Sequence, residues 1–328
     1  MKAIVFHEYG LPDVLKLEEV EKPAPKDNQV LIKIHAASVN DWDWGLLRGT
    51  PFANRTMFGL FKPKKVKILG LDVAGRIEAV GENAKQFQPG DEVFGDLSGC
   101  GFGGFAEYVC APENALLPKP AGMSFEQAAA TPQAALLALQ GLQFKGRIQN
   151  GQKVLINGAG GGAGTFAVQI AKSMGAEVTG VDSTAKLDML RTLGAAHVVD
   201  YTQEDFTRNG QLYDLILDTA AHHSFFDYKR ALGPNGIYAV VGGSTAVILQ
   251  TVLLGSLFSI FGSRKMGLVL HKPNKGLALF VELFEAGKVV PIIDRRYPLG
   301  EVPDALRYFG EGRAIGKLVI TLEQDDKT

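Results

Sequence analysis

The sequence contains few cysteines and no marked excess of charge, and both shortages exclude classes of protein. Of its 328 residues, only Cys100 and Cys110 are cysteines, and they do not form a CxxC pair. Reduced thiols in a cytoplasmic protein are the simplest interpretation of this pattern. The formal net charge is −1, so the composition does not favour nucleic acid as a partner, nor a polybasic attachment to anionic membranes.

Long hydrophobic runs are also scarce. The N-terminal residues resemble a strand and lack the apolar core of a signal peptide. The stretch 246–262 is nearly free of charge for 17 residues, which is at the lower edge of the ~20 that a membrane-spanning helix needs. We expect one or two buried or partner-facing helices there. A peripheral membrane contact or a subunit contact through 246–262 is the alternative.

The residues that are present predict a globular chain with two domains. Hydrophobic residues make up 46% and charged residues 21%, both ordinary values for a globular protein. The length suits two domains of roughly 100–200 residues each. Residues 1–121 carry short alternating strands punctuated by prolines, a pattern that is typical of a partly open β-barrel.

From Ser124 onwards the pattern changes to alternating helices and strands. A capping-box-like start at 124–127 predicts a helix over 128–142. Apolar strands then alternate with helices, which favours a doubly wound parallel sheet in an α/β domain. The predicted strands are 153–157, 177–181, 197–200, 215–218 and 236–242, and the predicted helices lie near 163–174, 185–193 and 224–232.

The C-terminal part adds an amphipathic helix over 274–286, a strand near 289–294, a helix over 301–310 and a strand over 317–321. We expect its last strands to return to the first domain and make that domain discontinuous. The predicted division is therefore a β-rich domain of residues 1–121 and 289–328, and an α/β domain of residues 122–288.

The strongest local motif is a glycine-rich turn between a strand and a helix. Five of the seven residues 158–164 are glycine, so a pyrophosphate can approach the backbone, and the amides that open the helix point towards it. About 20 residues later a second strand ends at Asp182, where such folds place the residue that contacts the adenosine ribose. The turn predicts a cofactor site made by Gly160, Gly161, Gly162 and Ala163.

Several segments spread along the chain match the signatures of one known family. They are MKAIVFHEYG, ASVNDWDWGLLRG, GLDVAGRIEAVG, QPGDEVFG, GQKVLINGAGGGAGTFAVQIAK, RTLGAAHVVDYTQEDF, AGKVVPIIDRRYPL and DALRYFGEGRAIGKLVIT. Through them the chain resembles, over essentially its whole length, the zinc-independent branch of the medium-chain dehydrogenase/reductases, which contains quinone oxidoreductases and enone reductases. Within this branch it is most similar to the subgroup of reticulon-interacting mitochondrial and chloroplast-envelope quinone-reductase-like proteins. The resemblance implies a Rossmann domain beside a GroES-like, partly open barrel.

The resemblance also implies a reaction without a metal ion. Zinc-dependent relatives use Cys and His ligands where this chain has Asn40, Leu71 and the stretch 128–139, which contains neither residue type. Zinc needs three or four N, S or O ligands, so we expect no zinc. Reduced nicotinamide can instead pass hydride to a planar conjugated substrate, either a quinone or an α,β-unsaturated carbonyl compound.

Several site residues follow from the resemblance alone. It implies that Asn40 lies beside the nicotinamide and that Trp44 faces the planar acceptor, with Asp43 in the same loop. The alternative for these residues is structural, with Asp43 capping a turn and Trp44 buried in the core. Further cofactor contacts that the resemblance implies are Tyr201, Thr219, Ala220, Gly242, Gly243 and, near the phosphates, Lys317.

The choice of nicotinamide cofactor depends on Asp182 and its neighbours. An acid at this position accepts the ribose hydroxyls and repels a 2′-phosphate, which favours NAD(H). Ser183 and Lys186 match a pattern that relatives using NADPH carry. These two residues favour NADP(H), with NAD(H) as the alternative.

Two other functions compete with a reductase. One is a nucleotide-binding regulatory or structural protein with little turnover, and the other is a zinc-type alcohol dehydrogenase, which the missing ligands argue against. For the oligomeric state we expect a monomer or a homodimer, as in the family that the chain resembles.

Overall fold

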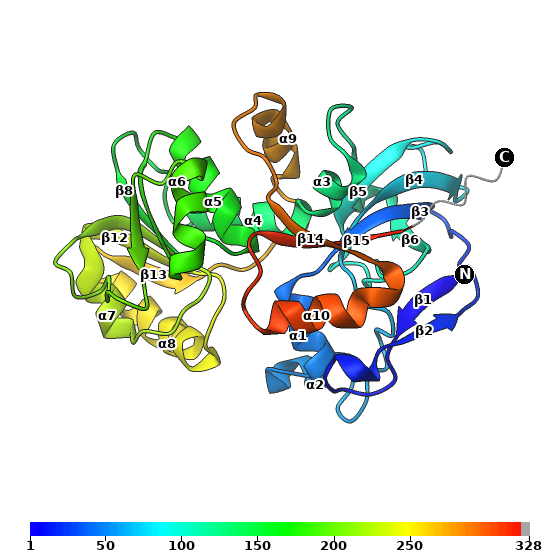
Figure 1. Cartoon of the computed structure of the whole chain (residues 1–328), viewed down its shortest axis with the longest axis horizontal. Coiled ribbons are helices and arrows are strands. Elements are labelled where there is room, and N and C mark those ends of the chain that lie inside the picture. The colour runs from blue at the N-terminus through cyan, green and yellow to red at the C-terminus, as the bar shows by residue number, and fades with distance from the viewer. Residues whose placement is uncertain (323–328) are drawn as a thin grey trace. The chain divides into compact units, whose positions relative to one another are not determined.

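The computed structural model describes residues 1–322, apart from the side chains of 256–261. The chain forms two units, which Figure 1 shows by element. The first comprises Met1–Gln133, Pro273–Val281 and Pro291–Thr328, and the second comprises Ala134–Lys272 and Glu282–Val290. The sequence had predicted the division at 121/122, and the last residues of its first domain, 323–328, lie outside the described part.

The second unit is built on a parallel sheet with the strand order β10-β9-β8-β11-β12-β13. This is the 3-2-1-4-5-6 order of a Rossmann fold, so the predicted doubly wound sheet is confirmed. The strands are β8 (Lys153–Asn157), β9 (Glu177–Asp182), β10 (His197–Asp200), β11 (Tyr213–Asp218), β12 (Leu232–Val240) and β13 (Lys265–Leu268).

Helices cover both faces of this sheet. In Figure 1, α5 and α6 lie on one face, where they contact β8, β9 and β10, while α7 and α8 contact β12 and β13 on the other. Large apolar side chains such as Ile216 and Tyr238 fill the core. The helices are α4 (Pro132–Leu142), α5 (Gly162–Ser173), α6 (Leu187–Leu193), α7 (Phe225–Ala231) and α8 (Thr245–Phe261), with a 3₁₀ turn η3 (Thr184–Lys186).

The first unit contains a seven-stranded sheet with the order β14-β15-β3-β4-β5-β7, in which β6 also pairs with β3, and a separate two-stranded sheet of β1 and β2. β3 is ten residues long and carries register shifts at its pairing with β4, and such bulges bend a strand so that a sheet can curl. The strands are β1 (Lys2–Val5), β2 (Lys16–Glu19), β3 (Gln29–Ser38), β4 (Asp72–Val80), β5 (Glu92–Asp96), β6 (Tyr108–Pro112), β7 (Leu117–Pro118), β14 (Ile293–Pro298) and β15 (Lys317–Thr321).

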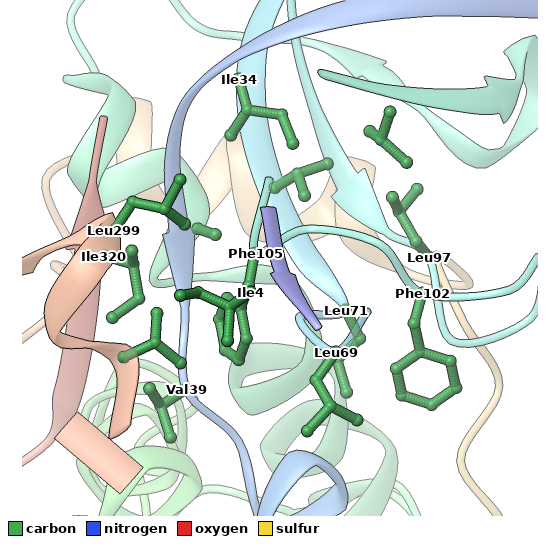
Figure 2. Packing of buried hydrophobic residues seen from close by; sticks show 14 of the residues in the cluster. Ile4, Ile34, Val39, Leu69, Leu71, Leu97, Phe102, Phe105, Leu299 and Ile320 are labelled. Atoms are coloured by element: carbon green, nitrogen blue, oxygen red, sulfur yellow. The ribbon is translucent and has the colours of Figure 1, made fainter. Parts of the chain in front are cut away.

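The C-terminal strands complete the first unit, as predicted. β15 pairs with β3 in antiparallel fashion, and β14 extends the sheet beside it. Side chains from distant parts of the chain form one core, and Figure 2 shows Ile4, Ile34, Phe105, Leu299 and Ile320 packed together. The helices here are α1 (Asp41–Arg48), α2 (Phe52–Phe58), α3 (Phe125–Ala129) and α10 (Val302–Gly310), with 3₁₀ turns η1 (Pro12–Val14), η2 (Glu113–Ala115) and η4 (Leu299–Glu301). Helix α9 (Leu277–Glu285) belongs to this unit up to Val281 and to the second unit from Glu282.

Four predicted elements differ from the structure. The strand predicted near 289–294 lies later in the chain, as β14 (Ile293–Pro298). The helix predicted over 128–142 is split into α3 and α4, because Pro132 lacks an N–H group and disfavours a helical residue before it. The helix predicted over 274–286 is shorter and begins at Leu277. Residues 40–44, predicted as a loop, are the cap and first turn of α1.

The apolar stretch 246–262 forms a single helix, α8. Its Val247 and Thr251 are buried, whereas Leu249, Val252 and Leu253 are exposed. The prediction for this stretch also covers 256–261, whose side chains lie outside the described residues. Within the part of the chain that the structure describes, no helix has the length and apolar character to cross a membrane.

Candidate active site and cofactor cradle

The glycine-rich turn after β8 requires its glycines for space and for conformation. Gly158 has a φ of +77°, and a Cβ there would lie 2.4 Å from the Thr219 hydroxyl oxygen. A Cβ on Gly164 would lie 2.2 Å from the Gly158 carbonyl oxygen. At these two positions the backbone therefore packs closely against neighbouring atoms with no side chain between them. Close approach of a phosphate to the backbone requires such glycines.

The turn leads directly into α5, a helix of 12 residues. Gly161 occupies its N-cap position and provides no side chain to cap the helix. The amides of the first turn, which includes Gly162 and Ala163, therefore suit an acceptor from outside the helix, and the helix dipole favours a negative one. Three of the predicted cofactor residues, Gly161, Gly162 and Ala163, thus lie together at the N-terminus of α5.

Asp182 points inward, onto the glycine turn. Its carboxylate accepts hydrogen bonds from the Gly160 amide at 2.7 Å and the Ser183 amide at 2.8 Å. The Lys186 ammonium lies 3.6 Å away, and both side chains of this pair are about nine-tenths buried. The prediction had weighed Asp182 against Lys186 as competing signals, whereas the structure pairs them.

Tyr201 lies next to this group. Its backbone N–H donates to the Asp182 carbonyl oxygen at 3.2 Å, and its side chain is 52% exposed. The predicted adenosine-side residues Asp182, Ser183, Lys186 and Tyr201 therefore form one cluster at the ends of β9 and β10.

A buried polar network at the strand ends was not predicted as part of the site. The Asn157 amide donates to Asp218 at 2.8 Å, and the Tyr238 hydroxyl donates to Asp218 at 2.9 Å. Burial raises the pKa of the Asp218 carboxyl above its ordinary value. A polar residue in last place on each of β8, β9 and β11 was the signal available in the sequence.

Thr219 and Ala220 follow β11 and form hydrogen bonds with residues next to the glycine turn. The Thr219 hydroxyl donates to the Asn157 carbonyl at 2.9 Å, and the Ala220 N–H donates to the Asp218 carboxylate at 3.1 Å. These contacts connect both residues to the cradle, although they are contacts to protein atoms. Their direct contact with a cofactor stays a prediction.

Gly242 and Gly243 form a tight connection to the loop after β11. The Ala221 N–H donates to the Gly242 carbonyl at 3.0 Å. Gly243 has a φ of +120°, and a Cβ there would lie 2.2 Å from the Ala221 nitrogen. Close backbone pairing thus explains why glycine stands at 243, and the contact of both residues with a nicotinamide stays a prediction.

In the first unit, Asn40 is the N-cap residue of α1 and is 4% exposed. Its amide NH₂ group donates to the Asp72 carboxylate at 3.0 Å and to the Ser38 carbonyl at 3.3 Å. Its amide oxygen accepts a hydrogen bond from the Lys317 ammonium. These three partners hold the amide in one orientation.

Asp43 has a capping role, which was the structural alternative for this residue. Its carboxylate accepts from the Asn40 N–H at 3.0 Å and from the Gly70 N–H at 2.8 Å, and the residue is 0% exposed. Desolvation by burial raises its pKa to about 7. A fully buried carboxyl whose oxygens face backbone amides matches the structural alternative, and a direct role of Asp43 towards a substrate stays a prediction.

Lys317 is buried as well. Its side chain is 3% exposed, lies 3.7 Å from Asp72 and donates to the Val39 carbonyl at 3.0 Å. Burial lowers the pKa of this ammonium and raises that of Asp72. The ammonium also donates to the Asn40 amide oxygen, 277 positions away in the sequence, and the predicted contact of Lys317 with the phosphates stays a prediction.

Trp44 packs against α10. A Cβ on Gly310 would lie 2.5 Å from the Trp44 ring, and the Arg48 guanidinium lies 4.8 Å above that ring. The ring therefore fills space within the first unit, as the structural alternative held for this residue. Trp42 is the more exposed of the two tryptophans, at 42%, and stacks on Phe102.

Metal ligands are not assembled in the described part of the chain. There, no group of three or more His, Cys, Asp or Glu residues is arranged to hold a metal ion. Leu71, at a position where the resemblance compares a zinc ligand, is a 0% exposed core residue.

Comparisons with known proteins agree with this architecture. Residues 26–121 match the family model described as the alcohol dehydrogenase GroES-like domain, and residues 193–320 match the one described as zinc-binding dehydrogenase. A solved quinone oxidoreductase from Coxiella burnetii is 31% identical, with a TM-score of 0.88 over 98% of this chain and 99% of that one.

Curated relatives match the chain almost end to end. The 2-methylene-furan-3-one reductase of Solanum lycopersicum is 35% identical over 98% of this chain and 79% of its own length. The chloroplast envelope quinone oxidoreductase homolog of Arabidopsis thaliana is 31% identical over 98% of both chains. The NADPH-dependent alkenal/one oxidoreductase of Arabidopsis thaliana is 32% identical over 98% of this chain and 79% of its own. The chain therefore belongs to the medium-chain dehydrogenase/reductase superfamily, with the quinone oxidoreductases as its homologues.

Proposed function

We propose that this protein is an NAD(P)H-dependent reductase of quinones or α,β-unsaturated carbonyl compounds. The observation that carries the proposal is the glycine-rich turn at Gly158–Gly164, in which only two alanines bear side chains and which leads into the N-terminus of α5, where a diphosphate would bind. Relatives at 31–35% identity are named as quinone, alkenal/one and furanone reductases. These names agree with a planar conjugated acceptor.

The residues present fit a nicotinamide dinucleotide. The first-turn amides of α5 would hold its diphosphate, and the Asp182 cluster would hold its adenosine end. When bound, the reduced nicotinamide supplies a hydride, which a conjugated acceptor takes up readily because conjugation spreads the resulting negative charge. The chain then has to bind, orient and desolvate the acceptor.

Asn40 is the residue of the first unit that we propose for this positioning. Both amide hydrogens are already donated, to Asp72 and Ser38. The amide oxygen accepts from Lys317 and has a second lone pair. We infer that Asn40 would accept a hydrogen bond from the carboxamide NH₂ of the nicotinamide and so orient the acceptor indirectly, because the carbonyl oxygen of a quinone or enone cannot donate one.

For the cofactor we infer a preference for NADP(H). An isolated carboxylate would repel a 2′-phosphate, but the Asp182 carboxylate is paired with Lys186 and bonded by two backbone amides. Its charge is therefore partly compensated, and Ser183 and Lys186 lie beside it. The ratio of kcat/KM for NADPH to that for NADH tests this, and a tenfold preference for NADH would contradict it.

The decisive experiment for the function is NADPH consumption with a panel of quinones and 2-alkenals. Steady turnover with either class supports the reductase and identifies the acceptor class. Tight cofactor binding without turnover on the whole panel would favour the nucleotide-binding regulatory protein instead. A metal assay on the purified protein tests the zinc-type alcohol dehydrogenase, for which stoichiometric zinc is required.

The oligomeric state and location belong to the same proposal. We expect a monomer or homodimer in the cytoplasm, which gel filtration and cell fractionation test. The exposed side chains Leu249, Val252 and Leu253 on α8 support the use of that helix as a subunit contact.

A further inference from the structure

A strongly basic segment lies between Asp43 and Asp72. It contains no aspartate or glutamate and six basic residues, whereas the whole chain is almost neutral at −1. Four of the basic residues, Lys62, Lys64, Lys65 and Lys67, are exposed within six positions. The net charge of the whole chain does not reveal this local excess of positive charge.

The same segment exposes large apolar side chains. Phe52 is 65% exposed, Met57 55%, Leu60 46% and Phe61 87%. A single exposed apolar residue is ordinary in a folded protein, but several together usually mark a contact surface. We call these four residues and the four exposed lysines the 52–67 surface.

Other residues hold the segment in place, so the exposed side chains are not needed for its folding. Val66 is 4% exposed and belongs to the core of the first unit, and the Phe58 ring packs edge-on against Phe102. The Tyr9 hydroxyl donates to the Gly59 carbonyl at 2.7 Å, and the Lys64 N–H donates to the Phe58 carbonyl at 3.0 Å. These contacts attach the segment to the rest of the first unit, while the side chains of Phe52 and Phe61 remain exposed.

We propose that the 52–67 surface docks on an anionic lipid bilayer. Phenylalanine, leucine and methionine side chains partition into the boundary between headgroups and acyl chains, while long lysine side chains reach the anionic headgroups. Protein–protein interfaces, in contrast, are depleted of lysine. Glu8 lines a hollow together with Leu60, Phe61, Lys62 and Lys64, and the lysines outnumber it.

The exposed side of α8 fits this partner less well. It also presents Leu249, Val252 and Leu253, but Thr245–Phe261 contains no basic residue. Attraction to anionic headgroups contributes to peripheral binding only where Lys or Arg lies near the surface. The charge complementarity therefore selects the 52–67 surface over 246–262.

Co-sedimentation of the full chain with vesicles tests the proposal. The vesicles consist of phosphatidylcholine with or without about 30% phosphatidylserine, an anionic content that attracts basic segments. We expect binding to the anionic vesicles only, weakened by added salt. Lys64→Glu with Lys65→Glu, and separately Phe52→Ser with Phe61→Ser, should each weaken this binding at least about tenfold.

Matched controls separate the surface from general effects. Lys16→Glu with Lys26→Glu reverses two exposed lysines of the same unit, and Leu249→Ser with Leu253→Ser removes exposed leucines from α8. Both control variants should bind like the parent, and thermal unfolding should show that all variants are folded. Equal loss of binding in the lysine control, or loss in the α8 variant alone, would overturn the proposal.

Two further outcomes would also overturn it. One is equal binding to neutral and anionic vesicles. The other is that the parent protein binds no vesicles and forms a dimer, and that Phe52→Ser with Phe61→Ser dissociates this dimer. The 52–67 surface would then contact a second copy of the chain. Vesicle binding does not require catalytic turnover, so the vesicle experiment can be interpreted even if the reductase assay shows no activity.

Discussion

The Lys317 ammonium and the Asp72 carboxylate lie 3.7 Å apart between β15 and β4, with side chains 3% and 0% exposed. Removing two charges from water costs several kcal/mol, which only good geometry and further hydrogen bonds offset. Those bonds are present, since the Gln133 N–H donates to Asp72 at 3.0 Å and Lys317 donates to the Val39 carbonyl. The pair holds Asn40 between a cation and an anion.

Replacing Lys317 by Met should destabilise the protein strongly. The Asp72 carboxyl would remain buried without its cation, so we expect the free energy of unfolding to fall by about 3 kcal/mol. Chemical denaturation measures it. Arg191→Met breaks the exposed pair with Asp188, whose side chains are 56% and 99% exposed, and should cost less than about 1 kcal/mol. Similar losses in the two variants would contradict the structural role of Lys317.

Asp43 should make stability depend on pH. Its folded-state pKa of about 7 exceeds the ordinary 3.8, so between these values the folded protein holds a proton that the unfolded chain releases. Its contribution to the free energy of unfolding is therefore complete below about pH 4 and is lost as the pH rises to about 7, by about 1.4 kcal/mol per pH unit.

Urea unfolding at several pH values measures this slope. Asp43→Asn should make it less steep, because the asparagine does not titrate, while the Asp72 carboxyl, whose pKa burial also raises to about 7, continues to contribute. Asp227→Asn is the control, since a hydrogen bond from the Ser224 hydroxyl lowers the Asp227 pKa and moves its effect below this pH window. An unchanged slope in Asp43→Asn would show that Asp43 is not the titrating group.

Two glycines of the cradle should respond differently to alanine. A Cβ on Gly164 would lie 2.2 Å from the Gly158 carbonyl oxygen, whereas at Gly161 the nearest atom is 3.4 Å away. Gly164→Ala should therefore lower the melting temperature by several degrees, about 4 °C or less per kcal/mol for a chain of this size. Gly161→Ala should fold normally but weaken NADPH binding, because its methyl group lies at the phosphate side of α5.

Fluorescence titration with NADPH and thermal unfolding distinguish the two effects. If Gly161→Ala bound NADPH as tightly as the parent, the first turn of α5 would not be the diphosphate site. If both variants lost stability equally, the close packing at Gly164 would not be the cause.

Lys186 should control the choice between the two nicotinamide cofactors. Lys186→Met removes a cation suited to a 2′-phosphate and also frees the Asp182 carboxylate to repel it. A charge-assisted contact is worth about 1.5–3 kcal/mol, so the NADPH-to-NADH ratio of kcat/KM should fall by about tenfold or more. Lys172→Met, an exposed change in the last turn of α5, should leave the ratio unchanged. A parent-like ratio in Lys186→Met would contradict the cofactor proposal.

Features that depend on neighbours in the chain were the ones that sequence reasoning found. The strand, glycine turn and helix around 153–173 were predicted within a residue or two, because turn chemistry and apolar periodicity are local. The start of α3 followed from its capping box at Ser124. The helix break at Pro132 was visible in the sequence but was overlooked.

Side-chain partners were predicted less well than elements. Trp44 and Asp43 were placed towards a substrate, but one packs on Gly310 and the other caps α1. The periodicity of a sequence shows that a residue faces inward without showing what it meets there. The same limit applied to Asp218, whose partners come from β8 and β12.

The kind of ligand could be predicted from the sequence, because a glycine-rich turn between a strand and a helix N-terminus leaves backbone amides open to a phosphate. The two-domain α/β architecture followed likewise from the periods of its strands and helices. The pairing of Asp182 with Lys186 and the bond from Lys317 to Asn40, 277 positions away, are visible only in the folded chain. The charge state and orientation of a buried group depend on desolvation and on neighbours that only folding brings together.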